Sequence, residues 1–565
     1  MVKPLPAWLR YVILGICAVT LLALFSGEIS DSDFWWTLKS GQYIAHNHKL
    51  PSPDPFSFTT AMAHDAYPGE SVVRQFNLTF EWLAQLIFYG TYSMAGFGGI
   101  VLLRALLLSS CCALIGAIAW MRCGGLYRSL AAAFGAASVL AIFFTYDRSY
   151  LFTYLFLALT LAILEWRRRL WLLPVIAIVW ANCHGGFFLQ WIAVGAYCLE
   201  AAWLRYRRKP QANERALWIT LAACVVASGI NPNGYRVLQV LYYFRRSFLQ
   251  SKLLEWQSPP LLPPSVFSAL LFAGAAVLIW RFRRVRLADW LLFAAFAAAA
   301  LMAQRNMFLV AFWAPVVLVT YVPWNRALPA LAHYSAALAA CLLLALAVSR
   351  GAFQFRVAEW RFPAGAADFL LTHHVTSRMF NTYELGGYLM WRLYPEERVF
   401  IDGRALSESV FGDYARILYN HSSSDGLPSG PEVLDRYNIQ TIVMNTFEYA
   451  EGLVYNLAPS LWDQDSKWKL VYNDPQALIF MREPPPGVQP IPNNTVFSHM
   501  EDECAVHLQH EPKVLLCARS LGLVFARIHD STRELKWLNY YLSQPHVKDP
   551  QAEAAYSQLF APQKR

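Results

Sequence analysis

Long apolar runs alternate with short polar segments over the first 350 positions of the chain. A helix needs about 20 apolar residues to cross the hydrocarbon core of a membrane. The runs therefore predict eleven membrane-spanning helices, at 7–27, 97–120, 126–146, 149–166, 170–185, 187–206, 214–230, 265–282, 287–303, 306–323 and 332–349. One polar interruption, 28–96, is much longer than the others, and loops of this length are usually functional.

The pattern changes beyond residue 351, where short strand-like and helix-like segments alternate. Such alternation predicts an α/β domain over 351–485, with strands at 378–380, 398–402, 441–444, 468–472 and 477–481 and helices at 363–374 and 432–437. A proline-rich linker and a helical tail follow over 486–565, and the paired short helices resemble a tetratricopeptide-like fragment. The expected fold class is a mainly α, polytopic membrane protein that carries a small α/β domain and a helical appendage.

Composition and charge agree with a membrane protein. Of the 565 residues, 56% are hydrophobic and only 15% are charged, whereas soluble domains carry roughly 25% charged residues. The net charge of +9 comes from arginine and lysine in alternate loops, which indicates membrane orientation and argues against nucleic-acid binding. The N-terminus is then cytoplasmic, and both the 28–96 loop and the region after residue 351 are extracytoplasmic.

The cysteines divide into two groups. Eight lie within or beside apolar runs, as small core residues commonly do. Only Cys504 and Cys517 lie in the polar tail, where they could form a disulfide if that tail is extracytoplasmic.

Asp31 and Asp33 follow the first apolar run and lead directly into Phe34, Trp35 and Trp36. Carboxylates beside a membrane are costly unless they are paired, protonated or metal-bound, so they are candidates for function. The alternative is a polar loop with an aromatic belt, because tryptophan favours membrane interfaces on any membrane protein.

Several segments together resemble the bacterial integral-membrane proteins related to the GT-C glycosyltransferases. That superfamily includes protein mannosyltransferases, the aminoarabinose transferase of lipid A and the catalytic subunit of oligosaccharyltransferase. The segments begin at Asp31, Asp54, Glu81, Arg148, Trp180, Asn231, Glu255, Arg305, Asn381 and Phe400 and cover most of residues 1–485. The resemblance implies a GT-C-like membrane domain over 1–350 and a place in the bacterial inner membrane.

The resemblance also implies a reaction. The donor is a sugar on a polyprenyl phosphate or diphosphate, and the acceptor is an extracytoplasmic protein, lipid or glycan. Residue by residue, it points to Asp31 and Asp33 as catalytic acids, with Glu81 as a further candidate in the same loop. A carboxylate can take the proton of an attacking hydroxyl. Asp31 and Asp33 could instead hold Mg²⁺ or Mn²⁺, but we expect no required metal.

A leaving phosphate needs positive charge or hydrogen-bond donors nearby. The candidates at predicted outer helix ends are Arg148, Arg305, Arg236 and His184. A lone arginine there is also typical of a side chain that reaches for lipid headgroups. The remaining pocket candidates are Trp35, Trp36, Asn182 and Tyr150.

Asp402 and Arg404 end a predicted strand in the α/β domain. They would form either an internal ion pair, which we favour, or a contact with the acceptor.

Two other functions fit the same composition. A transporter or flippase for a lipid-linked glycan would need polar residues in the middle of its spans and commonly has internal repeats. In this chain the predicted spans are polar mainly at their outer ends. A non-enzymatic envelope scaffold would instead use the soluble tail to bind a partner.

Overall fold

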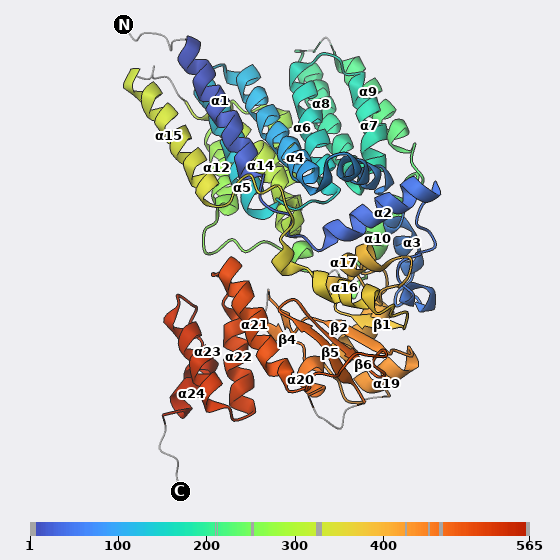
Figure 1. Cartoon of the computed structure of the whole chain (residues 1–565). Helices are drawn as coiled ribbons and strands as arrows, with labels where there is room; N and C mark the ends of the chain where they lie inside the picture. The colour runs from blue at the N-terminus through green and yellow to red at the C-terminus, as the bar shows by residue number, and fades with distance from the viewer. Residues whose placement is uncertain are drawn as a thin grey trace. The chain divides into compact units, whose positions relative to one another are not determined.

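A computed structural model describes residues 7–209, 211, 213–249, 253–323, 330–423, 426–449, 452–462 and 467–560. The chain folds into two compact units, one of Met1–Pro53 with Asp65–Val357 and one of Asp54–His64 with Ala358–Arg565. The first unit is a helix bundle (Figure 1). Its helices are α1 Ala7–Leu24, α2 Asp33–Asn47, α3 Glu70–Asn77, α4 Trp82–Cys123, α5 Leu126–Phe143, α6 Tyr150–Trp166, α7 Leu172–Cys183, α8 Phe188–Tyr206, α9 Glu214–Ser228, α10 Arg236–Phe244, α12 Val266–Trp280, α13 Leu287–Met302, α14 Met307–Tyr321 and α15 Ala330–Ser349, with short 3-10 turns η2 Gly185–Phe187, η3 Leu254–Trp256 and η4 Gln304–Asn306.

Each of the eleven apolar runs forms a helix or part of one. Among the described residues, four helical stretches are long and apolar enough to cross a membrane: Ala7–Leu24, Glu70–Cys123, Leu126–Phe143 and Gly185–Tyr206. Several further apolar helices are shorter, with 10–17 residues. The chain is therefore built as a membrane protein, and the number of spans stays a prediction.

Helix α14 forms the centre of the bundle. It is apolar on every side, and a helix of that kind is stable only when it is surrounded. Every side chain from Met307 to Val317 is buried, and α4, α5, α12 and α13 pack against it. Gly135 of α5 faces Pro315 of α14 so closely that an added Cβ would lie 3.0 Å from the proline ring.

Helix α4 is bent at Gly96, whose φ of 60° takes it out of the helical range. The bend separates a first part, which begins at Trp82 within the long polar loop, from the predicted span 97–120. The first part holds α2 at very short range, because the backbone at Gly41 would place a Cβ 2.1 Å from the carbonyl oxygen of Gln85. This close contact holds the middle of α2 against α4.

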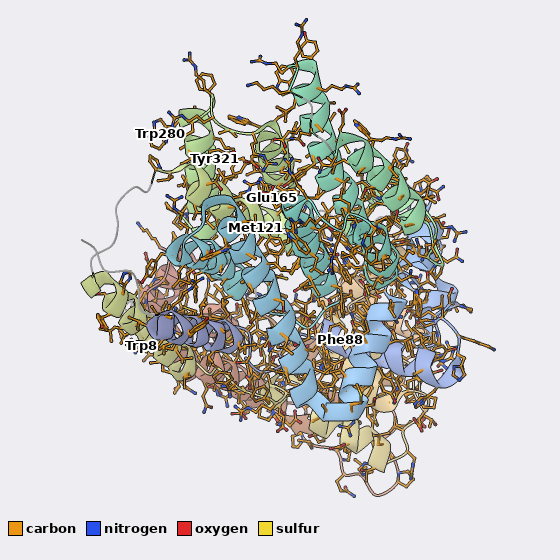
Figure 2. The ribbon with its side chains drawn as sticks, turned by 90° about the horizontal axis from the view of Figure 1, so that it is seen from above. Trp8, Phe88, Met121, Glu165, Trp280 and Tyr321 are labelled. Carbon is orange, nitrogen blue, oxygen red and sulfur yellow. A yellow bond between two sulfur atoms is a disulfide. The ribbon has the colours of Figure 1, made fainter. Side chains whose placement is uncertain are left out.

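Buried ion pairs join several helices of the bundle. Arg122 of α4 pairs with Glu165 of α6 at 2.8 Å and with Asp289 of α13 at 2.9 Å. Arg286 also pairs with Glu165, at 3.0 Å, and Tyr321 donates its hydroxyl to Asp289. Glu165 and Tyr321 are labelled in Figure 2, which views the bundle from above. The carboxylates are therefore compensated, as burial of charge requires.

The second unit contains a four-stranded sheet of order β1-β2-β6-β5. Strands β1 Met379–Asn381 and β2 Thr441–Met444 are parallel, whereas β6 Ala477–Met481 runs antiparallel to both β2 and β5 Lys469–Asp474. A separate pair joins β3 Phe447–Glu448 to β4 Leu453–Val454. The helices are α16 Ala364–Thr372, α17 Tyr383–Leu393, α18 Glu408–Leu418, α19 Gly430–Arg436, α20 Leu457–Ser460, α21 Thr495–His510, α22 Leu516–Arg527, α23 Ser531–Ser543 and α24 Pro550–Gln558, with 3-10 turns η1 Thr59–Met62 and η5 Glu359–Arg361. This confirms a small α/β region with a helical tail.

The strand predicted at 398–402 was wrong, although the others are present. Val399 makes only an isolated bridge to Ser57. The side chain of Asn381 hydrogen-bonds the backbone of the next two residues. Its Oδ1 accepts the N–H of Phe400 at 2.8 Å, and its Nδ2 donates to the carbonyl oxygen of Ile401 at 2.7 Å. Backbone groups satisfied in this way have no need of a strand partner.

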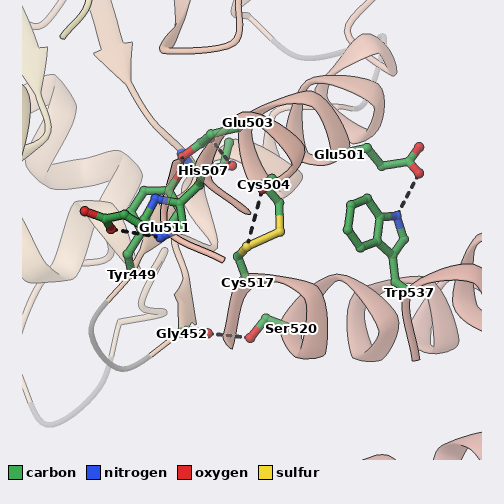
Figure 3. The surroundings of a disulfide bond; sticks show 11 residues. Tyr449, Gly452, Glu501, Glu503, Cys504, His507, Glu511, Cys517, Ser520 and Trp537 are labelled. Carbon is green, nitrogen blue, oxygen red and sulfur yellow. Dashed lines mark hydrogen bonds and ion pairs between the residues drawn. A yellow bond between two sulfur atoms is a disulfide. The ribbon is translucent and has the colours of Figure 1, made fainter. Parts of the chain in front are cut away.

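The tail helices share a hydrophobic core with the sheet, and their cysteines are paired. Cys504 of α21 and Cys517 of α22 form a disulfide (Figure 3). Close to it, the buried carboxylate of Glu503 accepts hydrogen bonds from the N–H of Thr446 at 2.8 Å and from the hydroxyl of Tyr449 at 2.6 Å. These contacts attach α21 to the segment that follows β2.

Candidate active site

Asp31 and Asp33 lie at the start of α2 in the first unit. The helix is held by the apolar side chains of Phe34 and Leu38, which are fully buried, and by Gly41 against α4. Asp31 accepts the backbone N–H of Asp33 at 3.3 Å. The segment that carries the two carboxylates is therefore held in position by the buried apolar side chains of α2.

Arg148 brings the two carboxylates together. Its Nε and Nη2 donate to Asp31 at 2.6 and 2.7 Å, a two-pronged contact that matches the guanidinium to a carboxylate. Its Nη1 lies 2.9 Å from Asp33. The Asp31 side chain is 4% exposed and the Asp33 side chain 14%. Arg148 is 117 residues away from Asp31 along the chain, and the fold makes them neighbours.

The ionisation of Asp33 is shifted by its surroundings. Burial raises the pKa of the Asp33 carboxyl to about 7, the positive charge of Arg148 opposes the rise, and the carboxylates of Asp31 and Glu255 add to it. An acid with a pKa near neutrality can accept and release a proton at physiological pH. Asp33 is thus better suited to proton transfer than an ordinary surface aspartate.

Arg104 and Asp147 support this arrangement, and the sequence analysis missed both. Arg104 of α4 is 2% exposed, pairs with Asp147 and donates to the carbonyl oxygens of Phe25 and Gly27. The signal was an arginine within a predicted span, because a charge there is usually retained for a partner or a function. Arg104 thereby ties the segment leading to Asp31 to the residue that precedes Arg148.

Arg305 reaches the same region through Glu255. Its Nη1 lies 3.4 Å from Glu255, whose other oxygen is 3.7 Å from Arg148. The guanidinium of Arg305 also stacks over Trp256, 4.4 Å from the ring centre. The structure therefore gathers two of the predicted phosphate-binding cations around one carboxylate for which the sequence analysis gave no role.

Glu81 and His184 form a second contact at the site. The Nε2 atom of His184 lies 4.0 Å from Glu81, and its Nδ1 accepts the N–H of Gly186 at 3.1 Å. This hydrogen bond assigns the ring proton to Nε2, on the side of Glu81. With its proton on Nε2, His184 offers a hydrogen-bond donor toward Glu81.

Of the predicted pocket residues, Asn182 and Trp35 stabilise the surrounding fold. Asn182 accepts the indole N–H of Trp82 at 2.8 Å and donates to the carbonyl of Ile230 at 2.8 Å, so it braces the first outer loop. Trp35 is buried, and its ring packs against Phe97.

Trp36 and Tyr150 are the neighbouring pocket residues. Trp36 is next to the Asp33 carboxylate, and Tyr150 is next to Arg148. Arg236, predicted to bind phosphate, donates to Gln75 of α3 at 3.4 Å, and its role stays a prediction.

Asp402 and Arg404 lie in the second unit, where the geometry favours the ion-pair alternative over acceptor contact. Arg404 donates to both oxygens of Asp402 at 2.7 Å. It also pairs with Asp54 at 3.0 Å, and the exposed fractions of the three side chains are between 0% and 3%. Their charged groups are occupied by one another.

The alternative of a divalent metal at Asp31 and Asp33 stays a prediction. Asp31 and Asp33 share a guanidinium between them. Among the described residues, no group of three histidine, cysteine or acidic side chains gathers as a ligand set.

The sequence matches no family model and no curated protein. Among solved structures, the chain is similar to the archaeal oligosaccharyltransferase AglB from Archaeoglobus fulgidus, in a complex with an inhibitory peptide and a dolichol-phosphate. The TM-score is 0.52 at 9% sequence identity, and the match covers 93% of this chain and 86% of that one. At this identity the likeness shows a related fold over nearly the whole chain.

Proposed function

We propose that this protein is a membrane glycosyltransferase. It would transfer a sugar from a polyprenyl phosphate or diphosphate to an acceptor hydroxyl or amide on a protein, lipid or glycan, at the outer face of a bacterial inner membrane. The observation that carries the proposal is the cluster of Asp31, Asp33 and Arg148, in a chain whose fold resembles an oligosaccharyltransferase.

The reaction needs one group to remove a proton and another to receive negative charge. The acceptor atom attacks the anomeric carbon as the bond from that carbon to the phosphate oxygen breaks. Asp33 takes the acceptor's proton, which suits a carboxyl whose pKa is about 7. The electron pair leaves with the phosphate, and Arg148 and Arg305 stabilise the charge that develops there.

The remaining residues have supporting roles. Asp31 accepts two hydrogen bonds from Arg148, and this contact fixes the orientation of the guanidinium group. His184 and Glu81 lie 4.0 Å apart close to the arginines, and we assign His184 the role of orienting Glu81 or the sugar. Such pre-set geometry lowers the entropy lost when the substrates meet.

The experiment is transfer by the full-length protein in lipid nanodiscs. The donors are polyprenyl phosphates and diphosphates carrying labelled sugars, and the readout is release of the lipid phosphate. We expect Asp33→Asn to reduce the rate by about 10²–10⁴-fold, the usual contribution of a general base.

The matched control is Asp65→Asn. Asp65 is an acid of the same outer loop that pairs with Arg74 at 3.4 Å, and this change should leave the rate within twofold. Full activity of both Asp31→Asn and Asp33→Asn would refute the proposal. Movement of an intact lipid-linked glycan across vesicles, with no bond broken, would favour a flippase instead.

A further inference from the structure

Glu255 occupies the space between two arginines. Its two oxygens lie 3.4 Å from Arg305 and 3.7 Å from Arg148. A carboxylate that bridges two guanidinium groups has the charge and the acceptor oxygens of a phosphate at the same place. The residue is therefore located where the proposed leaving group would have to bind.

The contacts of Glu255 are weaker than those of its neighbours. Arg148 meets Asp31 and Asp33 at 2.6 to 2.9 Å, whereas both contacts of Glu255 are longer than 3.3 Å. The Glu255 side chain is also 41% exposed, and exposed ion pairs contribute little to stability. Of the acids around Arg148, Glu255 is the easiest to displace.

The arginines can remain in place if Glu255 turns away. Arg148 is held by Asp31 and Asp33, and Arg305 is held by its stacking on Trp256. The backbone N–H of Gln304 also donates to the carbonyl of Gln257 at 2.9 Å, which joins the two segments that carry Arg305 and Glu255. Rotation of one side chain is enough to open the site.

The charges at the site require such an exchange. Asp31, Asp33 and Glu255 surround Arg148 and Arg305, with Glu81 close by. A phosphate that bound beside an ionised Glu255 would add negative charge to a cluster that already has more acids than cations. A carboxylate and a sugar phosphodiester each carry one negative charge, so the net charge around the arginines is preserved if Glu255 leaves as such a phosphate enters, and a diphosphate would add one further negative charge.

We propose that Glu255 is an internal substitute for the donor's phosphate, displaced when a phosphate group binds between Arg148 and Arg305. This inference rests on the proposed function and concerns the regulation of its donor site. While the site is empty of donor, Glu255 neutralises the arginines. Only an anion that bridges both arginines better than a carboxylate can replace it.

The test is phosphate binding by the full-length protein in nanodiscs of uncharged lipid. Glu255→Gln keeps the size of the side chain and removes its charge. We expect it to bind a short-chain polyprenyl phosphate about tenfold more tightly than the wild type. Glu255→Asp keeps the charge and should stay within about threefold of the wild type, as should Asp65→Asn.

A second titration uses inorganic phosphate as the probe. If Glu255→Gln tightens binding of both probes, the exchange is supported and the arginines recognise phosphate alone. If only the lipid probe binds more tightly, the exchange is supported and the lipid chain is also required.

Two results would overturn the inference. If the wild type transfers sugar but Glu255→Gln binds the lipid phosphate no more tightly, this inference fails and the proposed function stands. If the wild type binds no lipid phosphate and transfers no sugar, both fail.

Discussion

The pH dependence of the proposed transfer reaction should report the ionisation of Asp33. Its pKa is raised to about 7, mainly by burial. A base acts only in its deprotonated form, so the rate should fall as the pH drops through about 7 and level off above it. Arg148 opposes the rise in this pKa, because a neighbouring positive charge favours the carboxylate. Weakening the interaction of Arg148 with Asp33 should therefore move the acidic limb of the pH–rate profile to higher pH.

The substitution Arg148→Lys measures the size of this effect. Lysine keeps the positive charge but cannot contact Asp31 at 2.6 and 2.7 Å and Asp33 at 2.9 Å at the same time. A hydrogen bond to a charged group contributes about 1.5–3 kcal/mol, and one pKa unit corresponds to about 1.4 kcal/mol. If lysine stays with Asp31, the limb should rise by about 1–2 pH units.

The assay is the initial rate of lipid-phosphate release by the full-length protein from pH 5 to 9, with saturating donor. Arg356→Lys is the control, because the Arg356 side chain is 71% exposed and pairs with Glu28 on the surface. Its profile should match that of the wild type. An Arg148→Lys profile with its midpoint unchanged, or at lower pH, would refute the role given to Asp33.

Three further predictions concern the framework. Gly41→Ala would place a methyl group 2.1 Å from the Gln85 carbonyl oxygen, so α2 must shift and the transfer rate should fall at least tenfold. The control Gly15→Ala has open space around the added methyl group and should leave the rate unchanged in the same assay. Cys504→Ser removes the disulfide with Cys517, 13 residues away in the chain, and should lower the free energy of unfolding by about 3 kcal/mol. Thermal unfolding should show a lower Tm for this variant and an unchanged Tm for the control Cys341→Ser. Arg404→Ala leaves the buried carboxylates of Asp54 and Asp402 without their partner and should lower the free energy of unfolding by about 3–5 kcal/mol. The control Arg436→Ala removes a half-exposed arginine and should lower it by at most about 1 kcal/mol. Equal losses in denaturant titrations would contradict this.

Local patterns were sufficient for most of the helices and strands. Each apolar run from Ala7 to Ser349 coincides with a helix, because the length of an apolar run and its lack of breaking residues act on the nearby backbone alone. The strands β2, β5 and β6 were also predicted from the residues of their own segments. The failure at 398–402 arose because Asn381, from elsewhere in the chain, bonds the backbone there.

The sequence by itself determined that this is an apolar, helix-rich membrane protein with acids at the start of its first long loop and a C-terminal α/β region. Only the tertiary structure decided which charges meet. The pairing of Asp31 with Arg148, the bracing of that pair by Arg104 and Asp147, and the bridge that Glu255 makes to Arg305 all join segments far apart along the chain. Such contacts depend on how whole helices pack, and no pattern of neighbouring residues encodes them.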